Sequence, residues 1–115
     1  MDEEAVFKRY DVRGKYPEEL DERFAENIGK ATGTFAVRNY EPKVVVTKDN
    51  KETSVKLKKA LIEGIKSTGA KVIDTGTGPT DYAAFMGKDR DAISVQVTSS
   101  HMPLEFNGFK FMYPE

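Results

Sequence analysis

Three short runs of β-branched residues, alternating with amphipathic segments, constrain the fold of this chain more than any other feature. The runs cover 43–47, 71–75 and 92–97 and predict three strands, and the composition of the first is typical of a strand buried on both faces of a sheet. Apolar residues recur every three or four positions over 20–37 and 53–68, which predicts two helices. Connections long enough to hold a helix join parallel strands. We therefore expect an α/β fold, a three-layer α/β/α domain with a mainly parallel, mixed sheet.

The limits of the helices follow from capping residues. Thr53 and Ser54 are candidate caps of the second helix, and Gly69 stands where a left-handed residue ends a helix. A short helix is expected from Pro79 to Met86, and a last strand over 108–113. That strand ends two residues before the sequence does, so we expect a truncated chain. The apolar face of the first helix is expected to consist of Leu20, Phe24, Ile28, Ala31 and Phe35.

Charge and cysteine content narrow the function. Eighteen basic and nineteen acidic residues give a net charge of −1, which favours neither nucleic acid nor an anionic membrane as a partner. The absence of cysteine excludes a disulfide scaffold and a thiolate metal site. The longest clearly apolar run, 44–46, is too short to span a bilayer, and the acidic N-terminus lacks the features of a signal peptide. We expect one domain in the cytoplasm.

The segment after the third predicted strand is the most informative for chemistry. Residues 98–110 read T-S-S-H-M-P-L-E-F-N-G-F-K. A serine here could accept a phosphoryl group, with Gly108 allowing a tight backbone path and Lys110 supplying a cation. The residues alone leave open a polar loop in which Ser99 and Ser100 only bond the backbone. Because ligands gather at the carboxyl ends of parallel strands, the loops at 47–50, 76–78 and 98–101 should face one crevice.

Two motifs carry a resemblance to a known family. The pattern T-x-S-H-x-P followed by N-G-F-K resembles the phosphoserine loop of the α-D-phosphohexomutases, T-A-S-H-N-P followed by N-G-x-K. Residues 7–14, F-K-R-Y-D-V-R-G, are similar to the family's F-R-x-Y-D-I-R-G, and the tyrosine favours the phosphomannomutase/phosphoglucomutase branch. The resemblance extends over essentially the entire chain.

The resemblance implies roles for five residues. Ser100 corresponds to the phosphorylated serine, which carries the phosphoryl group and binds Mg²⁺, and His101 is its catalytic neighbour. Lys110 corresponds to the lysine beside the phosphate, Arg13 lies next to the phosphoserine, and Tyr10 lies near the floor of the active site, where the substrate binds. The implied reaction moves phosphate between C1 and C6 of hexose phosphates through a hexose 1,6-bisphosphate.

By the same resemblance, residues 1–115 are domain I, and domains II to IV, which bring the other metal ligands, sugar recognition and phosphate anchoring, are absent. We therefore expect no turnover from this chain alone. An alternative is a stand-alone, non-catalytic binding module, which Thr47, Lys48 and Met102 favour because they depart from the family pattern. A third possibility, action in trans with a partner carrying the missing domains, requires an exposed apolar surface around Phe109 and Phe111.

Overall fold

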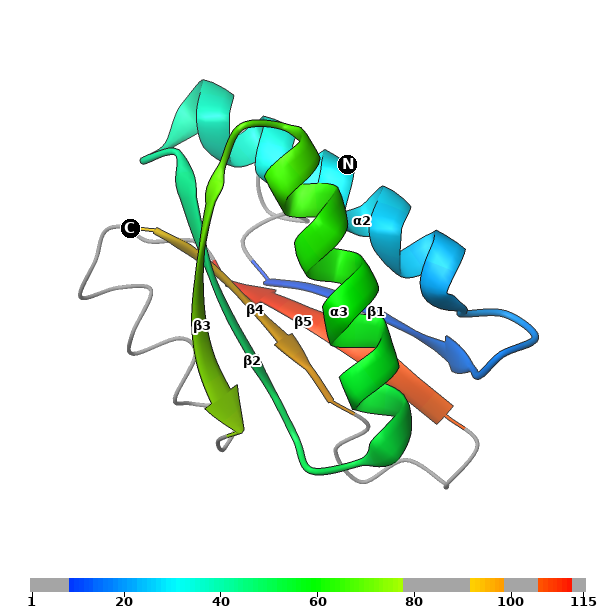
Figure 1. Ribbon diagram of the computed structural model, residues 1–115. Coiled ribbons are helices and arrows are strands. Elements are labelled where there is room, and N and C mark those ends of the chain that lie inside the picture. Colours follow the sequence, from blue (N-terminus) through cyan, green and yellow to red (C-terminus); the bar gives the residue numbers. More distant parts are fainter. Residues whose placement is uncertain (1–8, 78–91, 99–105, 113–115) are drawn as a thin grey trace.

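The computed structural model describes residues 9–77, 92–98 and 106–112. A five-stranded mixed sheet has the strand order β1-β5-β4-β2-β3, and two helices lie side by side over one of its faces (Figure 1). β2 is parallel to β3 and β4, whereas β5 is antiparallel to β4 and β1. The predicted α/β class with a mixed sheet is confirmed. In chain order the elements are β1 (Arg9–Lys15), α2 (Glu22–Asn39), β2 (Lys43–Lys48), α3 (Glu52–Ser67), β3 (Lys71–Thr77), β4 (Ile93–Val97) and β5 (Phe106–Met112).

The core lies between the helices and the sheet. Residues 44–47 of β2 are buried, which confirms the prediction that this strand is covered on both faces, and every residue of β4 is buried as well. Burial of each large aliphatic side chain contributes about 1.5–3 kcal/mol. The residues that face the helices include Val44, Val46, Val95, Val97 and Phe109, packed with Leu57, Leu61 and Ile65 of α3.

Glycines form the contact between α2 and α3. A Cβ atom on Gly29 would lie 2.2 Å from the carbonyl oxygen of Leu61, and one on Gly64 would lie 2.0 Å from that of Glu26. These distances leave no room for a side chain. The two helix backbones therefore meet directly.

The predicted apolar face of α2 is only partly right. Ile28 and Phe35 pack against the core, but Phe24 and Ala31 are exposed. Small side chains permit the close contact with α3, and a periodicity based on bulky apolar residues does not detect them. The buried residues of α2 are Ala25, Gly29, Thr32, Gly33 and Ala36.

The helix starts also differ from the prediction. α2 begins at Glu22 instead of Leu20, because the Asp21 side chain caps it by accepting a hydrogen bond from the Phe24 N–H at 2.8 Å. Leu20 is nevertheless buried, as part of the turn before the helix.

Thr53 and Ser54 lie within the first turn of α3, so the prediction that they cap it is wrong. The cap position is Lys51, and its side chain makes no capping bond. Gly69 follows the helix with a φ of +89°, which confirms the left-handed residue expected there.

β1 was not expected from the sequence, and β5 begins at Phe106, two residues earlier than predicted. Phe109 and Phe111 are buried, so the exposed apolar surface that action in trans would require is not formed by these residues. The short helix expected from Pro79 to Met86 lies outside the described residues.

Candidate functional site

The carboxyl ends of the parallel strands meet at one edge of the sheet. At the end of β2, the Lys48 ammonium donates to the Thr77 hydroxyl at the end of β3, at 3.0 Å. The Asp49 N–H donates to the carbonyl of Val97, the last residue of β4, also at 3.0 Å. The loops after β2, β3 and β4 thus start from one edge, and the crevice predicted between them stays a prediction, because residues 78 and 99–101 lie outside the described part of the chain.

Arg13 and Lys110 project from the same face of this sheet. In the antiparallel pairing of β1 with β5, Arg13 lies opposite Gly108, and Val12 opposite Phe109. Val12 and Phe109 pack into the core beneath the helices. Because side chains alternate along a strand, Arg13 and Lys110 point to the opposite face. The register therefore brings two of the predicted cationic residues to one side of the sheet.

Gly108 allows β5 to approach β1 closely. A Cβ atom here would lie 2.4 Å from the Val12 carbonyl oxygen and 3.1 Å from both Cα and Cβ of Arg13. Its own carbonyl accepts a hydrogen bond from the Thr98 N–H at 2.9 Å. Gly108 thus joins the end of β4 to the strand that carries Arg13, which agrees with the tight backbone path predicted for it.

Several predicted site residues lie outside the described part of the chain. These are Ser100, His101 and Met102, and Tyr10 is described only by its backbone position in β1. Thr98, the last described residue before Ser100, is buried. The structure thus gives the base of the predicted phosphoserine loop.

The sequence did not single out a buried polar cluster at this base. Asn107, which follows the first residue of β5, is fully buried and donates hydrogen bonds to the hydroxyls of Thr53 and Ser54. Ser54 in turn donates to the Asp49 carboxylate. The asparagine of the N-G-F-K motif was the available signal, because a buried amide needs specific partners.

Two described groups have shifted pKa values: Asp74 in β3 and Tyr16, which follows β1. Burial of the Asp74 carboxylate raises its pKa, but hydrogen bonds from Lys58 and the Gly76 N–H, with attraction to Lys58 and Lys48, outweigh this and lower it overall. The Lys58 ammonium lies 2.6 Å from the carboxylate.

For Tyr16, a hydrogen bond to Glu22 is the main cause that raises the pKa to about 12, helped by burial and by the negative charges of Glu22 and Asp21.

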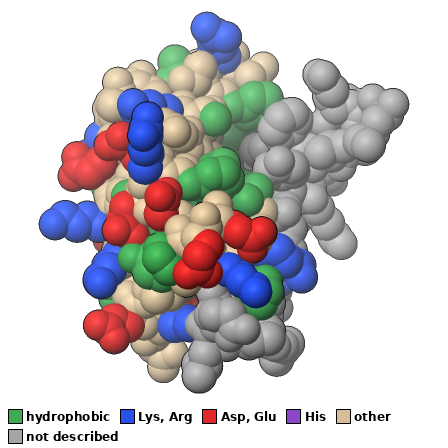
Figure 2. Space-filling model, turned by 90° about the vertical axis from the view of Figure 1, so that its right-hand side faces the viewer, with side chains coloured by type: hydrophobic (Ala, Val, Ile, Leu, Met, Phe, Trp, Pro, Cys, Tyr) green, Lys and Arg blue, Asp and Glu red, His purple; other side chains and the backbone are tan. Residues whose placement is uncertain are grey.

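The described residues include no metal cluster, and the face drawn in Figure 2 carries no charge patch of a single sign. Over 9–77, 92–98 and 106–112, no group of three His, Cys, Asp or Glu side chains could hold a metal ion. Figure 2 shows acidic and basic side chains intermingled on one face of the molecule. Among the described helices, none is long and apolar enough to cross a membrane.

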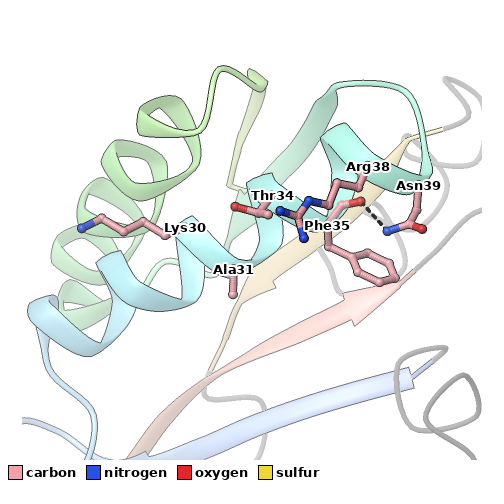
Figure 3. Close-up of a pocket in the computed structure, with 6 residues that line it drawn as sticks. All are labelled: Lys30, Ala31, Thr34, Phe35, Arg38 and Asn39. Carbon is pink, nitrogen blue, oxygen red and sulfur yellow. Dashed lines mark hydrogen bonds between the residues drawn. The ribbon is translucent and has the colours of Figure 1, made fainter.

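A hollow of about 380 Å³ lies along α2, away from the edge described above (Figure 3). It is near the end of α2 that leads into the start of β2, at the opposite edge of the sheet from the strand ends. The Asn39 amide donates to the Phe35 carbonyl at 3.1 Å within it. The hollow is lined by Lys30, Ala31, Thr34, Phe35, Arg38 and Asn39.

Comparison with known proteins gives one consistent result. Residues 4–115 match the family described as phosphoglucomutase/phosphomannomutase, alpha/beta/alpha domain I, which agrees with the predicted three-layer fold. A phosphomannomutase of Vibrio cholerae is 39% identical, over 97% of this chain and 25% of that protein. A phosphomannomutase of Klebsiella pneumoniae is 38% identical, over 97% of this chain and 70% of that protein.

A solved structure shows the same fold. A phosphoglucomutase/phosphomannomutase family protein of Burkholderia thailandensis superimposes with a TM-score of 0.86 at 32% identity, covering 98% of this chain and 27% of that one. Apart from the Klebsiella protein, the chain spans about a quarter of the length of these relatives.

Proposed function

This chain belongs to the phosphoglucomutase/phosphomannomutase family as its domain I, and on that premise we propose that it carries the phosphoserine of a hexose-phosphate mutase. The protein that contains it would be an intramolecular phosphotransferase of the isomerase class, acting on mannose or glucose phosphates. The observation that supports the proposal best is the pairing of Arg13 with Gly108, which places the arginine one strand away from the base of the Ser100 loop.

The proposed reaction has two phosphoryl transfers, one from Ser100 to the sugar and one from the sugar back to Ser100. The bond from phosphorus to the serine oxygen breaks as a bond to a sugar hydroxyl oxygen forms; the hydroxyl loses its proton, and the serine oxygen gains one. The resulting 1,6-bisphosphate reorients and returns its other phosphoryl group to Ser100 by the reverse step. Arg13 and Lys110 would offset the charge that develops, and Lys110 and His101 would take part in proton transfer.

Mg²⁺ is also part of the proposal. The described residues offer no set of metal ligands, so this chain's proposed contribution is the phosphorylated Ser100. When bound there, the ion would neutralise charge on the phosphoryl oxygens. We also propose a cytoplasmic location, which the absence of cysteine from the sequence supports.

Because the chain spans about a quarter of most of these relatives, we propose that residues 1–115 by themselves do not turn over hexose phosphates. Conversion of mannose 1-phosphate or glucose 1-phosphate by the purified 115-residue chain would contradict this. The segments that correspond to domains II to IV would supply sugar recognition and the remaining metal ligands. Supply in trans would need a contact surface other than Phe109 and Phe111, which are buried.

Two of the residues that favoured a non-catalytic module, Thr47 and Lys48, have a structural role in this fold, which weakens that alternative. Thr47 is buried and donates to the Gly76 carbonyl at 2.9 Å, while Lys48 bonds Thr77. Both therefore link the ends of β2 and β3, which gives their departure from the family pattern a structural reason.

A matched pair of serine variants tests the proposed function. In the polypeptide as its own gene encodes it, Ser100→Ala should abolish interconversion of hexose 1- and 6-phosphates, because no phosphoryl carrier remains. Ser99→Ala should retain most of the activity. Equal activity of the Ser100→Ala and wild-type proteins would disprove the proposal.

A further inference from the structure

A buried amide orients the start of β5. The Asn107 Nδ2 donates to the Thr53 hydroxyl at 2.8 Å and to the Ser54 hydroxyl at 3.0 Å, while its Oδ1 accepts the Gly108 N–H at 2.8 Å. Because only the amide oxygen can accept from an N–H, this third bond fixes which end of the amide faces α3. Asn107 therefore ties β5 to the first turn of the helix in one orientation.

The same cluster continues into the loop after β2. Ser54 donates to the Asp49 Oδ1 at 2.6 Å, and this oxygen also accepts the Lys51 N–H at 3.0 Å. The Lys51 ammonium donates to the Phe106 carbonyl at 2.7 Å, and the Asp49 N–H bonds Val97. The loop after β2 is thus bonded to the end of β4 and to the start of β5 at once.

These bonds hold both ends of the segment 99–105. The chain leaves β4 at Thr98, whose N–H is bonded to the Gly108 carbonyl, and it re-enters the sheet at Phe106. At the centre of this network Asn107 and Ser54 are buried, and leaving either side chain without its partner would be destabilising by about 1–3 kcal/mol, which favours one fixed arrangement. Fixing the ends of a short segment also limits the positions open to its middle.

We propose that Asn107, acting through Ser54 and Asp49, is a positioning residue that sets where the phosphoryl group on Ser100 lies. This inference rests on the proposed function, because it concerns the placement of that serine. Asn107 is not expected to touch the substrate, so its effect is on the geometry of transfer. A displacement of about 1 Å at a reacting centre can reduce rate about 100-fold.

The test measures turnover of hexose phosphates by the complete protein product of the native gene. Asn107→Ala should lower kcat about 10- to 100-fold with KM nearly unchanged, since transfer geometry changes and substrate binding does not. Asn39→Ala is the matched control, because that amide is exposed and bonds only within α2 as far as the structure describes it. Asp49→Asn keeps an acceptor oxygen and should stay near wild type, whereas Asp49→Ala should behave like Asn107→Ala.

Each outcome decides the proposal. A folded Asn107→Ala protein with wild-type kcat, or an Asp49→Asn protein as slow as Asp49→Ala, would overturn the positioning role alone. If Asn107→Ala does not fold, Ser54→Ala replaces it as the test, because it removes only one hydroxyl of the network. Ser54→Ala should lower kcat, by a smaller factor than expected for Asn107→Ala. A wild-type kcat for Ser54→Ala would overturn the positioning role. If the wild-type protein carries no phosphate on Ser100, the proposed function fails and the positioning role with it.

Discussion

Replacing Gly108 with alanine should separate β1 from β5 and move Arg13. The new Cβ would lie 2.4 Å from the Val12 carbonyl oxygen, against about 3.5 Å for an ordinary contact, so β1 must retreat by about 1 Å. Two or three hydrogen bonds around Arg13 would weaken, at about 0.5–1.5 kcal/mol each. The lower backbone freedom of unfolded alanine returns about 0.5–1 kcal/mol. With each contribution at the middle of its range, the expected net loss of unfolding free energy is about 2 kcal/mol.

Urea denaturation of the wild-type and Gly108→Ala chains measures this loss, and amide exchange locates it. Exchange should accelerate in β1 and in the first residues of β5, with little change in β2 and β3. Gly14→Ala is the matched control in the same strand pair, because its Cβ would lie 3.2 Å from the Glu19 Cβ, only slightly closer than an ordinary contact, so a much smaller loss is expected. Equal denaturation midpoints for Gly108→Ala and the wild type would refute the argument from close strand approach.

Three further predictions concern packing and ionisation. Gly64→Ala should lower Tm by about 5 °C or more, because its Cβ would lie 2.0 Å from a backbone oxygen of α2; an unchanged calorimetric Tm would contradict the glycine contact. The lowered pKa of Asp74 gives stability that is present above the unfolded pKa of about 3.9 and is lost as pH falls through the folded pKa. Lys58→Met should therefore flatten the fall of unfolding free energy below about pH 4, by less than about 1 kcal/mol because the carboxylate is half exposed. The raised pKa of Tyr16 gives stability that is present below the unfolded pKa of about 10 and is lost as pH rises through about 12. Ultraviolet absorbance follows ionisation of the tyrosines, and the contribution of Tyr16 is the difference between the wild type and Tyr16→Phe. This contribution should titrate at about pH 12 in the wild type and nearer pH 10 in Glu22→Gln. The same midpoint in both proteins would contradict the hydrogen bond to Glu22.

The sequence predicted the parallel core and the position of the loops, but not the contacts made by small or distant residues. The valine run of β2 predicts a buried strand, because a short continuous run of β-branched apolar residues is typical of a strand with both faces covered. Gly29 and Gly64 give no such signal, since a close helix contact depends on side chains that are absent. β1 pairs with a strand nearly a hundred residues later, so no local pattern identifies it. Asn107 finds Ser54 across 53 positions for the same reason.

For the site, too, the sequence predicted what a local motif carries, but not the contacts between distant residues. The motifs gave residue types at fixed spacing, and the strand register then showed that Arg13 and Lys110 share a face. The roles of Ser100, His101 and Tyr10 remain predictions from the motifs. The polar cluster around Asn107 needed the fold, because its members come from a loop, a helix and a strand.

Phosphopeptide mapping of the protein isolated from its native cells tests the central claim most directly, with an intact mass to give the length of the chain. We predict one phosphate, on the peptide that contains Ser100 and on that serine instead of Ser99. A protein that carries no phosphate at Ser100, even after incubation with a hexose 1,6-bisphosphate and Mg²⁺, would contradict the account.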